Sequence, residues 1–129
     1  MTGIIALIGA PTDVGAGARG ASMGPEALRV AQLQSVLEAQ GLEVIDRGNL
    51  GGPPNPWQPP VSGYRHLPEV TEWNRLVHEA VLEELAAGRL PMLLGGGVIL
   101  FGTALVLGLL RPGSPTPTLP RSRGRAREG

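Results

Sequence analysis

Three glycines, Gly95, Gly96 and Gly97, follow a short apolar run at the point where this chain is best placed to do chemistry. The run, residues 90–94, has the length and composition of a buried strand in a parallel sheet. In open α/β sheets, ligands bind just beyond the carboxyl ends of such strands. After Gly97, however, the chain has no histidine, and its only acidic residue is Glu128. The residues before Gly97 therefore indicate the front of an α/β enzyme, and those after it offer almost nothing for acid–base chemistry or metal binding.

A glycine-rich loop near the amino terminus matches the G-x-G-x-x-G pattern of dinucleotide-binding loops at Gly15, Gly17 and Gly20. That chemistry needs the first glycine at the end of a strand, so that the amides of the following helix meet the pyrophosphate. Here Gly15 lies five residues beyond Ala10, and the next helix is expected only after Gly20. We interpret the match as a result of composition. A small nucleotide-binding α/β module that uses this loop is kept as an alternative.

The chain has two histidines, His66 and His78, and no cysteine. Thiolate catalysis, disulfides and cysteine-based metal sites are therefore excluded. Neither histidine shares a metal-ligand spacing with a carboxylate, because His78 and its neighbour Glu79 point apart on a helix. We expect a surface or capping role for both histidines.

Three short apolar runs predict β-strands at residues 4–8, 42–46 and 90–94. Helical patterns lie between them, so the expected order is β-α-β-loop-α-β with right-handed crossovers. The predicted fold class is α/β, with a partial three-layer parallel sheet. The loop, residues 47–68, contains Trp57, and loops of this length often carry function.

The first helix is expected to begin at Ser22 as its N-cap, with Pro25 in the first turn, and to end at Gly41. The second helix is expected between Pro68 and Gly88. Its predicted apolar stripe consists of Val70, Trp73, Val77, Ala80 or Val81, and Leu85. Its five glutamates are expected mostly outside that stripe: Glu69, Glu72, Glu79, Glu83 and Glu84.

The charges are unevenly distributed, although eleven arginines balance eleven acids and there is no lysine. Residues 91–110 carry no charge over a length that suits a transmembrane helix, so a single-span membrane protein is a second alternative. The glycines at 95–97 interrupt that run and argue against a span. Residues 111–129 hold five arginines and one acid without interleaved aromatic residues. This composition favours a disordered tail over a nucleic-acid-binding arm.

Several stretches together resemble the opening of the arginase family, the ureohydrolases of arginase and agmatinase type. They are Ile8-Gly9-Ala10-Pro11, Gly17-Ala18-Arg19-Gly20, Gly24-Pro25-Glu26-Ala27-Leu28-Arg29, Val44-Ile45-Asp46-Arg47-Gly48-Asn49-Leu50 and Leu93-Leu94-Gly95-Gly96. The resemblance covers residues 4–96 and implies the amino-terminal portion of a family member. It is specific because the stretches occur in combination and in order.

The resemblance implies a hydrolase of arginine metabolism, in which two Mn²⁺ ions generate a hydroxide that attacks a guanidinium carbon. For arginase the substrate is L-arginine and the products are urea and ornithine, but the sequence does not decide between arginine and related guanidino substrates. The resemblance also implies a cytoplasmic location and a homo-oligomeric full-length enzyme. From the residue patterns at 91–110 and 111–129 we expect no nucleic-acid partner and no membrane association. This chain departs from the family at Gly97-Val98, where the family has Asp-His. No catalytic, cofactor-binding or metal-binding residue is carried over, and we expect the chain alone to bind no Mn²⁺ and to be inactive.

The departure also suggests how the chain is divided. We expect residues 1–96 to form the amino-terminal part of an arginase-like domain, residues 97–110 to be an apolar run of undetermined structure, and residues 111–129 to be a disordered tail. The arginine- and proline-rich composition after Leu110, together with the absence of lysine, suggests a change of reading frame near codon 96. A three-stranded sheet would leave an uncovered edge, so aggregation or partial disorder is expected.

Overall fold

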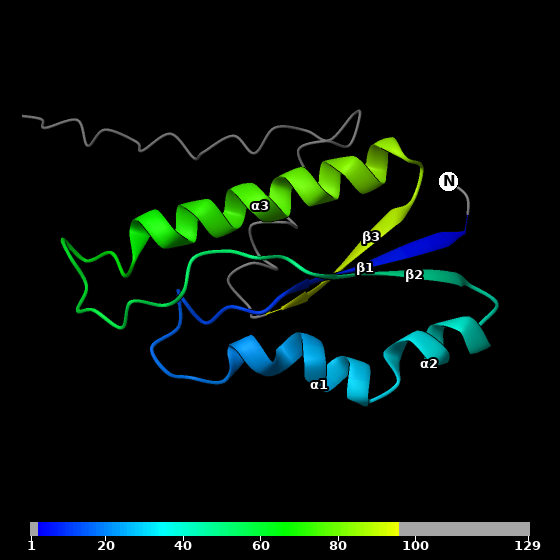
Figure 1. Ribbon diagram of the computed structural model, residues 1–129, viewed down its shortest axis with the longest axis horizontal. Coiled ribbons are helices and arrows are strands. Elements are labelled where there is room, and N and C mark those ends of the chain that lie inside the picture. The colour runs from blue at the N-terminus through cyan, green and yellow to red at the C-terminus, as the bar shows by residue number, and fades with distance from the viewer. Residues whose placement is uncertain (1–2, 96–129) are drawn as a thin grey trace, which may run out of the picture.

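The computed structural model describes residues 3–95, which form a parallel three-stranded sheet between two helical layers (Figure 1). The elements are β1 (Ile4–Ala10), the 3₁₀ turn η1 (Ala21–Met23), α1 (Gly24–Val30), α2 (Leu33–Ala39), β2 (Glu43–Asn49), α3 (Leu67–Ala86) and β3 (Leu90–Gly95). The strand order is β2-β1-β3, and both pairings are parallel. The predicted α/β class and element order are thereby confirmed.

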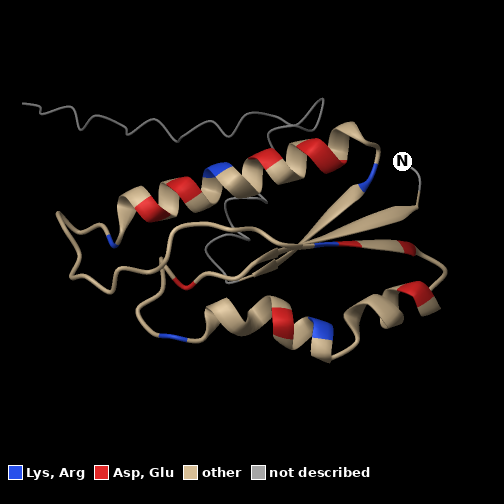
Figure 2. Ribbon diagram, in the orientation of Figure 1, with Lys and Arg blue, Asp and Glu red and all other residues tan. Residues whose placement is uncertain are grey.

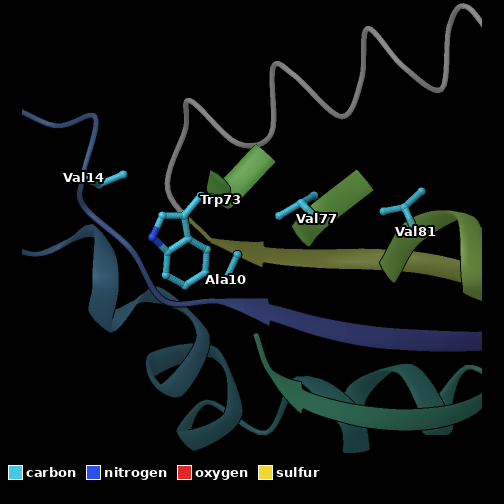
Figure 3. Close-up of a cluster of buried hydrophobic side chains, with 5 residues drawn as sticks. All are labelled: Ala10, Val14, Trp73, Val77 and Val81. Carbon is cyan, nitrogen blue, oxygen red and sulfur yellow. The ribbon is translucent and has the colours of Figure 1, made fainter. Parts of the chain in front are cut away.

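The central strand β1 is buried on both faces because it alternates side chains between the two helical layers. Ile5 and Leu7 pack with Leu94 on the side of α2. Ala10 packs with Trp73 and the rest of the buried stripe of α3 on the other side (Figure 3). Figure 2 shows that β1 and β3 carry no charged residue, whereas β2 does. The apolar run of β1 therefore corresponds to the most deeply buried element.

The first helix differs from the expectation in that it is two helices. Gln32 adopts a left-handed conformation (φ 64°) between α1 and α2. The break lets α1 lie beside β3 and α2 beside β2, so that the segment follows the twisted sheet. Ser22 lies in η1 and is not the N-cap, although Pro25 does occupy the first turn of α1. Gly41, in the left-handed region (φ 82°), follows the end of α2 as predicted.

The stripe of α3 contains one residue that the sequence pattern placed elsewhere. The buried positions of α3 are Trp73, Val77, Val81 and Glu84. Glu84 is 2% exposed because both carboxylate oxygens are paired, Oε1 with Arg47 Nε at 2.9 Å and Oε2 with Arg89 Nε at 2.5 Å. A carboxylate that is paired on both oxygens can occupy a buried position that would otherwise require an apolar side chain.

The predicted membrane run, residues 91–110, begins inside the sheet, since Pro91 to Gly95 belong to β3. None of the helices formed by residues 3–95 is long and apolar enough to cross a membrane. Residues 96–110 of that run and the arginine-rich residues 111–129 lie outside the described part of the chain. Within residues 3–95, β3 has β1 as its single partner strand, so its other edge is unpaired as expected.

Candidate functional site

A hollow of about 650 Å³ lies at the carboxyl ends of β1 and β2. This volume falls within the range of small-molecule pockets, roughly 300–1,000 Å³. Its polar walls come from the loop that follows β1 and from η1. Its remaining walls come from the loop that follows β2 and from α3. The lining residues are Pro11, Thr12, Asp13, Arg19, Gly20, Ser22, Met23, Gly52, Pro53, Pro54, Asn55, Trp57 and Trp73.

The two loops that form the hollow are held to each other and to α3 by hydrogen bonds. The side-chain amide of Asn55 donates to the carboxylate of Asp13 (3.1 Å) and lies 3.2 Å from the carbonyl oxygen of Asp13. The indole N–H of Trp73 donates to the carbonyl of Pro53 (2.8 Å). A side chain at Gly52 would overlap the Trp73 ring, so only glycine allows the loop to lie this close to α3.

His66 contacts both loops, the one that follows β1 and the one that follows β2. Its ring is buried, with Nδ1 2.7 Å from the carbonyl of Val14, while Nε2 accepts from the backbone N–H of Gln58 at 3.0 Å. The neutral ring protonated on Nδ1 satisfies both contacts. Of the two roles expected for His66, the surface role is wrong because the residue is buried. His66 does occupy the N-cap position of α3, where its carbonyl accepts the N–H of Val70, but its side chain makes no cap hydrogen bond. His78 lies exposed on α3, as expected.

Behind the hollow, Arg29 of α1 joins the carboxyl end of β2. Its guanidinium contacts both carboxylate oxygens of Asp46 (2.8 and 2.9 Å), and its Nη1 donates to Asn49 (2.6 Å) and Glu26 (2.7 Å). The hydrogen bond from Arg29 lowers the pKa of Asp46 below its ordinary value, and the same hydrogen bond raises the pKa of Arg29. This network links α1 to the carboxyl end of β2.

Gly9 allows that network to form. A side chain at Gly9 would overlap the amide of Asn49, which is the acceptor for Arg29. The backbone N–H of Leu50 also donates to the carbonyl of Gly9 (2.8 Å), so the end of β2 is held against β1. Gly9, Arg29, Asp46 and Asn49 all lie in stretches of the sequence that resemble the family, but the pattern of residues does not reveal their contacts. The bidentate spacing of one arginine and one aspartate becomes visible only when α1 and β2 are placed side by side.

The glycine-rich loop does not form a dinucleotide-binding turn. The loop and then η1 separate Ala10, the end of β1, from α1, which begins at Gly24. Gly15 therefore lies neither at the strand end nor at the helix start, which are the positions that the dinucleotide-binding pattern requires. This geometry supports the interpretation that the G-x-G-x-x-G match results from composition, and it disfavours the nucleotide-binding alternative.

The residues present do not fit a pair of metal ions. Within the described range 3–95, no three His, Asp or Glu side chains lie together in a way that could hold a metal. His66 has both ring nitrogens engaged by backbone groups. Asp13, the one carboxylate of the hollow, has Asn55 as its hydrogen-bond partner. Beyond Gly95 the sequence supplies Gly97-Val98 and no histidine. The donor set of a hydrolytic metal centre is therefore incomplete.

Known proteins share the sequence and the architecture of this chain. A sequence model of the arginase family matches residues 4–103. The chain is 35% identical to the arginase of Brevibacillus brevis over 92 residues, which cover 71% of this chain and 31% of that protein. It is 34% identical to the arginase of Brucella melitensis over 95 residues, which cover 73% of this chain and 31% of that protein.

Solved structures agree with these sequence matches. The arginase of Bacillus caldovelox superposes with a TM-score of 0.70 at 32% identity and covers 81% of this chain and 36% of that one. The arginase of Bacillus subtilis gives a TM-score of 0.66 at 29% identity and covers 81% and 34%. The chain thus spans about a third of the length of the curated relatives it matches. The parallel sheet, the loops at its carboxyl edge and these matches together show that the chain belongs to the arginase family.

Proposed function

We propose that this chain provides the amino-terminal scaffold of an arginase-type ureohydrolase without the residues that hold its metal pair. The observation that carries the proposal is Gly97-Val98, which follows Gly95-Gly96 where the family has Asp-His. We further propose that the chain does not hydrolyse guanidino compounds by itself. For the complete enzyme type, the proposed substrate is L-arginine, the products are urea and ornithine, and the location is the cytoplasm.

The metal pair of a complete enzyme would lower the pKa of a shared water and so supply hydroxide at neutral pH. The residues of this chain would instead shape the hollow next to the position of the substrate. The loops that follow β1 and β2, together with Trp73 of α3, line the hollow at the carboxyl edge of the sheet. Their hydrogen bonds to each other and to α3 keep that wall in place.

The family match extends to residue 103, beyond Gly97 and Val98. The missing ligand types therefore lie inside the matched region. Gly97 and Val98 could have replaced Asp-His through a change of reading frame near codon 96 or through simple substitution. The proposed lack of activity follows from the residue types in either case. Translating the DNA of codons 90–129 in all three forward frames tests the frame change, which predicts Asp-His in a neighbouring frame and is contradicted by its absence there.

The proposal is tested by urea release from L-arginine by the purified full chain, with and without added Mn²⁺. We expect no release above a protein-free blank in either condition. An active arginase, for example that of Brevibacillus brevis, serves as the control for the assay. Mn²⁺ binding measured by electron paramagnetic resonance gives a second readout, because free and protein-bound Mn²⁺ differ in their spectra. Mn²⁺-dependent urea release above the blank would contradict the proposal.

A further inference from the structure

A second groove, separate from the hollow, lies where the loop that follows β2 runs into α3. It has a volume of about 460 Å³, and its lining includes Pro59, Val61, Tyr64, Leu67, Pro68 and Glu69. Figure 1 shows this segment projecting beyond the sheet at the start of α3. Three of the apolar lining residues, Val61, Tyr64 and Leu67, are 75%, 62% and 52% exposed. The groove therefore presents an apolar surface that no described part of the chain covers.

The walls of this groove are held in place by hydrogen bonds. Val61 and Tyr64 form an antiparallel bridge with two backbone hydrogen bonds of 2.9 Å. Ser62 and Gly63 between them are both left-handed (φ 51° and 80°), as a tight two-residue hairpin turn requires. On the other side, the buried ring of His66 accepts the backbone N–H of Gln58 at 3.0 Å. A ligand therefore meets a groove that is already formed and does not have to order it.

Glu69 adds a negative charge to the groove. It lies in the first turn of α3 and forms no ion pair and no side-chain hydrogen bond among residues 3–95. Glu72 and Glu79, farther along the same helix, are both paired with Arg75. A cationic side chain that enters the groove would thus find an unpaired carboxylate at Glu69.

The chain itself contains a segment with matching properties, outside the part that the structure describes. Residues 112–120 contain four prolines, and Arg121 and Arg123 follow them directly. Pro117 and Pro120 are three residues apart, which is the period of a polyproline II helix, so that conformation would place both rings on one edge. Proline-rich segments of this spacing bind to grooves lined by aromatic side chains. A segment too polar to form its own core can become ordered on such a surface.

We propose that residues 117–123 dock in this groove of the same chain, with Pro117 and Pro120 against Tyr64 and Leu67 and the following arginines beside Glu69. Residues 96–116 connect the segment to β3, whose carboxyl end lies at the same edge of the sheet as that of β2. A coil of about twenty residues spans about 25 Å. The covalent connection gives the segment a high effective concentration, so weak contacts suffice. The inference does not depend on the proposed function.

The test uses a spin label at the end of the full chain. Because the sequence has no cysteine, Ala126→Cys provides a single position for a nitroxide, which broadens the NMR signals of nearby amides in the ¹⁵N-labelled protein. We expect the strongest broadening at Val61, Tyr64 and Leu67, and its relief by an excess of a synthetic peptide of residues 112–125. Absence of broadening, or broadening centred on Glu72 and Glu79, would overturn the inference.

A mixed sample separates docking within one chain from contact between two copies. The spin-labelled chain without ¹⁵N is mixed with a ¹⁵N-labelled chain that carries no cysteine. We expect no selective broadening in this mixture. Broadening as strong as in the singly labelled protein would assign the groove to a second copy of the chain and overturn the inference.

Variants locate the contacts. Pro117→Ser together with Pro120→Ser should abolish the selective broadening, whereas Pro112→Ser together with Pro115→Ser is the matched control and should retain it. All four substitutions lie outside the described scaffold, so a loss of folding does not confuse the result. Broadening that survives replacement of Pro117 and Pro120 would overturn the inference.

Charge reversal tests the role of Glu69. Glu69→Arg should lower the ratio of docked to undocked chains by about two- to fivefold, the range expected for an exposed ion pair. Arg121→Glu and Arg123→Glu in the same chain should restore it. Glu43→Arg is the control, since Glu43 is exposed at the start of β2 and does not line the groove. Equal effects of Glu69→Arg and Glu43→Arg would overturn the assignment.

Discussion

Arg29 and Asp46 form a bidentate ion pair, Nε to Oδ2 at 2.8 Å and Nη2 to Oδ1 at 2.9 Å, that joins α1 to β2. The side chains are 20% and 29% exposed, so water screens the pair only in part. The same carboxylate accepts the backbone N–H of Gly48 at 2.8 Å, which supports the left-handed turn of that glycine. This pair thus connects the helical layer to the strand end that leads into the hollow.

Arg29→Lys should destabilise the fold, because lysine cannot reproduce the bidentate contact or reach Asn49 and Glu26 at the same time. We expect a loss of about 1–2 kcal/mol in the free energy of unfolding, measured by urea denaturation. The exposed Arg75, whose ion pairs lie along one face of α3, is the matched control. Arg75→Lys should change stability by less than about 0.5 kcal/mol. Equal losses in the two variants would contradict this role of Arg29.

The lowered pKa of Asp46 predicts how stability depends on pH. Because the folded protein holds the carboxylate in its charged form more strongly than the unfolded chain does, the pair stabilises the fold above the ordinary aspartate pKa of 3.8. This contribution is lost as the pH falls from that value through the lower pKa of the folded state. Asp46→Asn should remove this part of the acid sensitivity. Urea denaturation between pH 7 and acid would measure it, and profiles of identical shape in the two proteins would refute the assignment.

Glu84 is predicted to be the most sensitive charged residue of α3. Glu84→Ala leaves Arg47 and Arg89 without their shared carboxylate and opens a void in the buried stripe. Both arginines keep partial contact with water, being 45% and 24% exposed, so we expect a loss of about 2–3 kcal/mol and not the full cost of breaking a buried pair.

The neighbouring Glu83 provides the control for that prediction. Glu83 is 70% exposed and lies 4.0 Å from Arg47. Glu83→Ala should therefore change the free energy of unfolding by less than about 0.5 kcal/mol. Thermal or urea denaturation of both variants compares the two positions, and a Glu84 variant as stable as the Glu83 variant would show that the buried pairing is unimportant.

His66 is predicted to order the loops around the hollow. His66→Ala leaves the carbonyl of Val14 and the N–H of Gln58 without their partner, at a cost of about 1–3 kcal/mol. Hydrogen exchange should accelerate at Gln58 and in the loop that follows β1. His78→Ala, at an exposed position of α3, should leave exchange and stability unchanged. Unaltered exchange of Gln58 in the His66 variant would argue against this role.

Local sequence patterns determined much of the scaffold. The β-branched run that begins at Ile4 becomes the central strand, since an uncharged run can be buried on both faces of a parallel sheet. Pro25 lies in the first turn of α1 because its fixed φ suits that position. Gly41 and Gly88 follow the ends of helices in left-handed conformations that favour glycine. These features depend on a few neighbouring residues, so they can be predicted from the chain itself.

The tertiary structure decided the features whose causes lie far apart in the chain. Glu84 can be buried only because β2 brings Arg47 to it, and His66 is buried because Val14 lies across from it, 52 residues away. The break at Gln32 follows from the need of two short helices to lie beside different strands. The hollow likewise needs Arg19 and Trp57, from different loops, in contact. The sequence alone shows that Gly97-Val98 supplies no metal ligand. Which polar groups meet in the hollow at the sheet edge depends on how distant segments pack together.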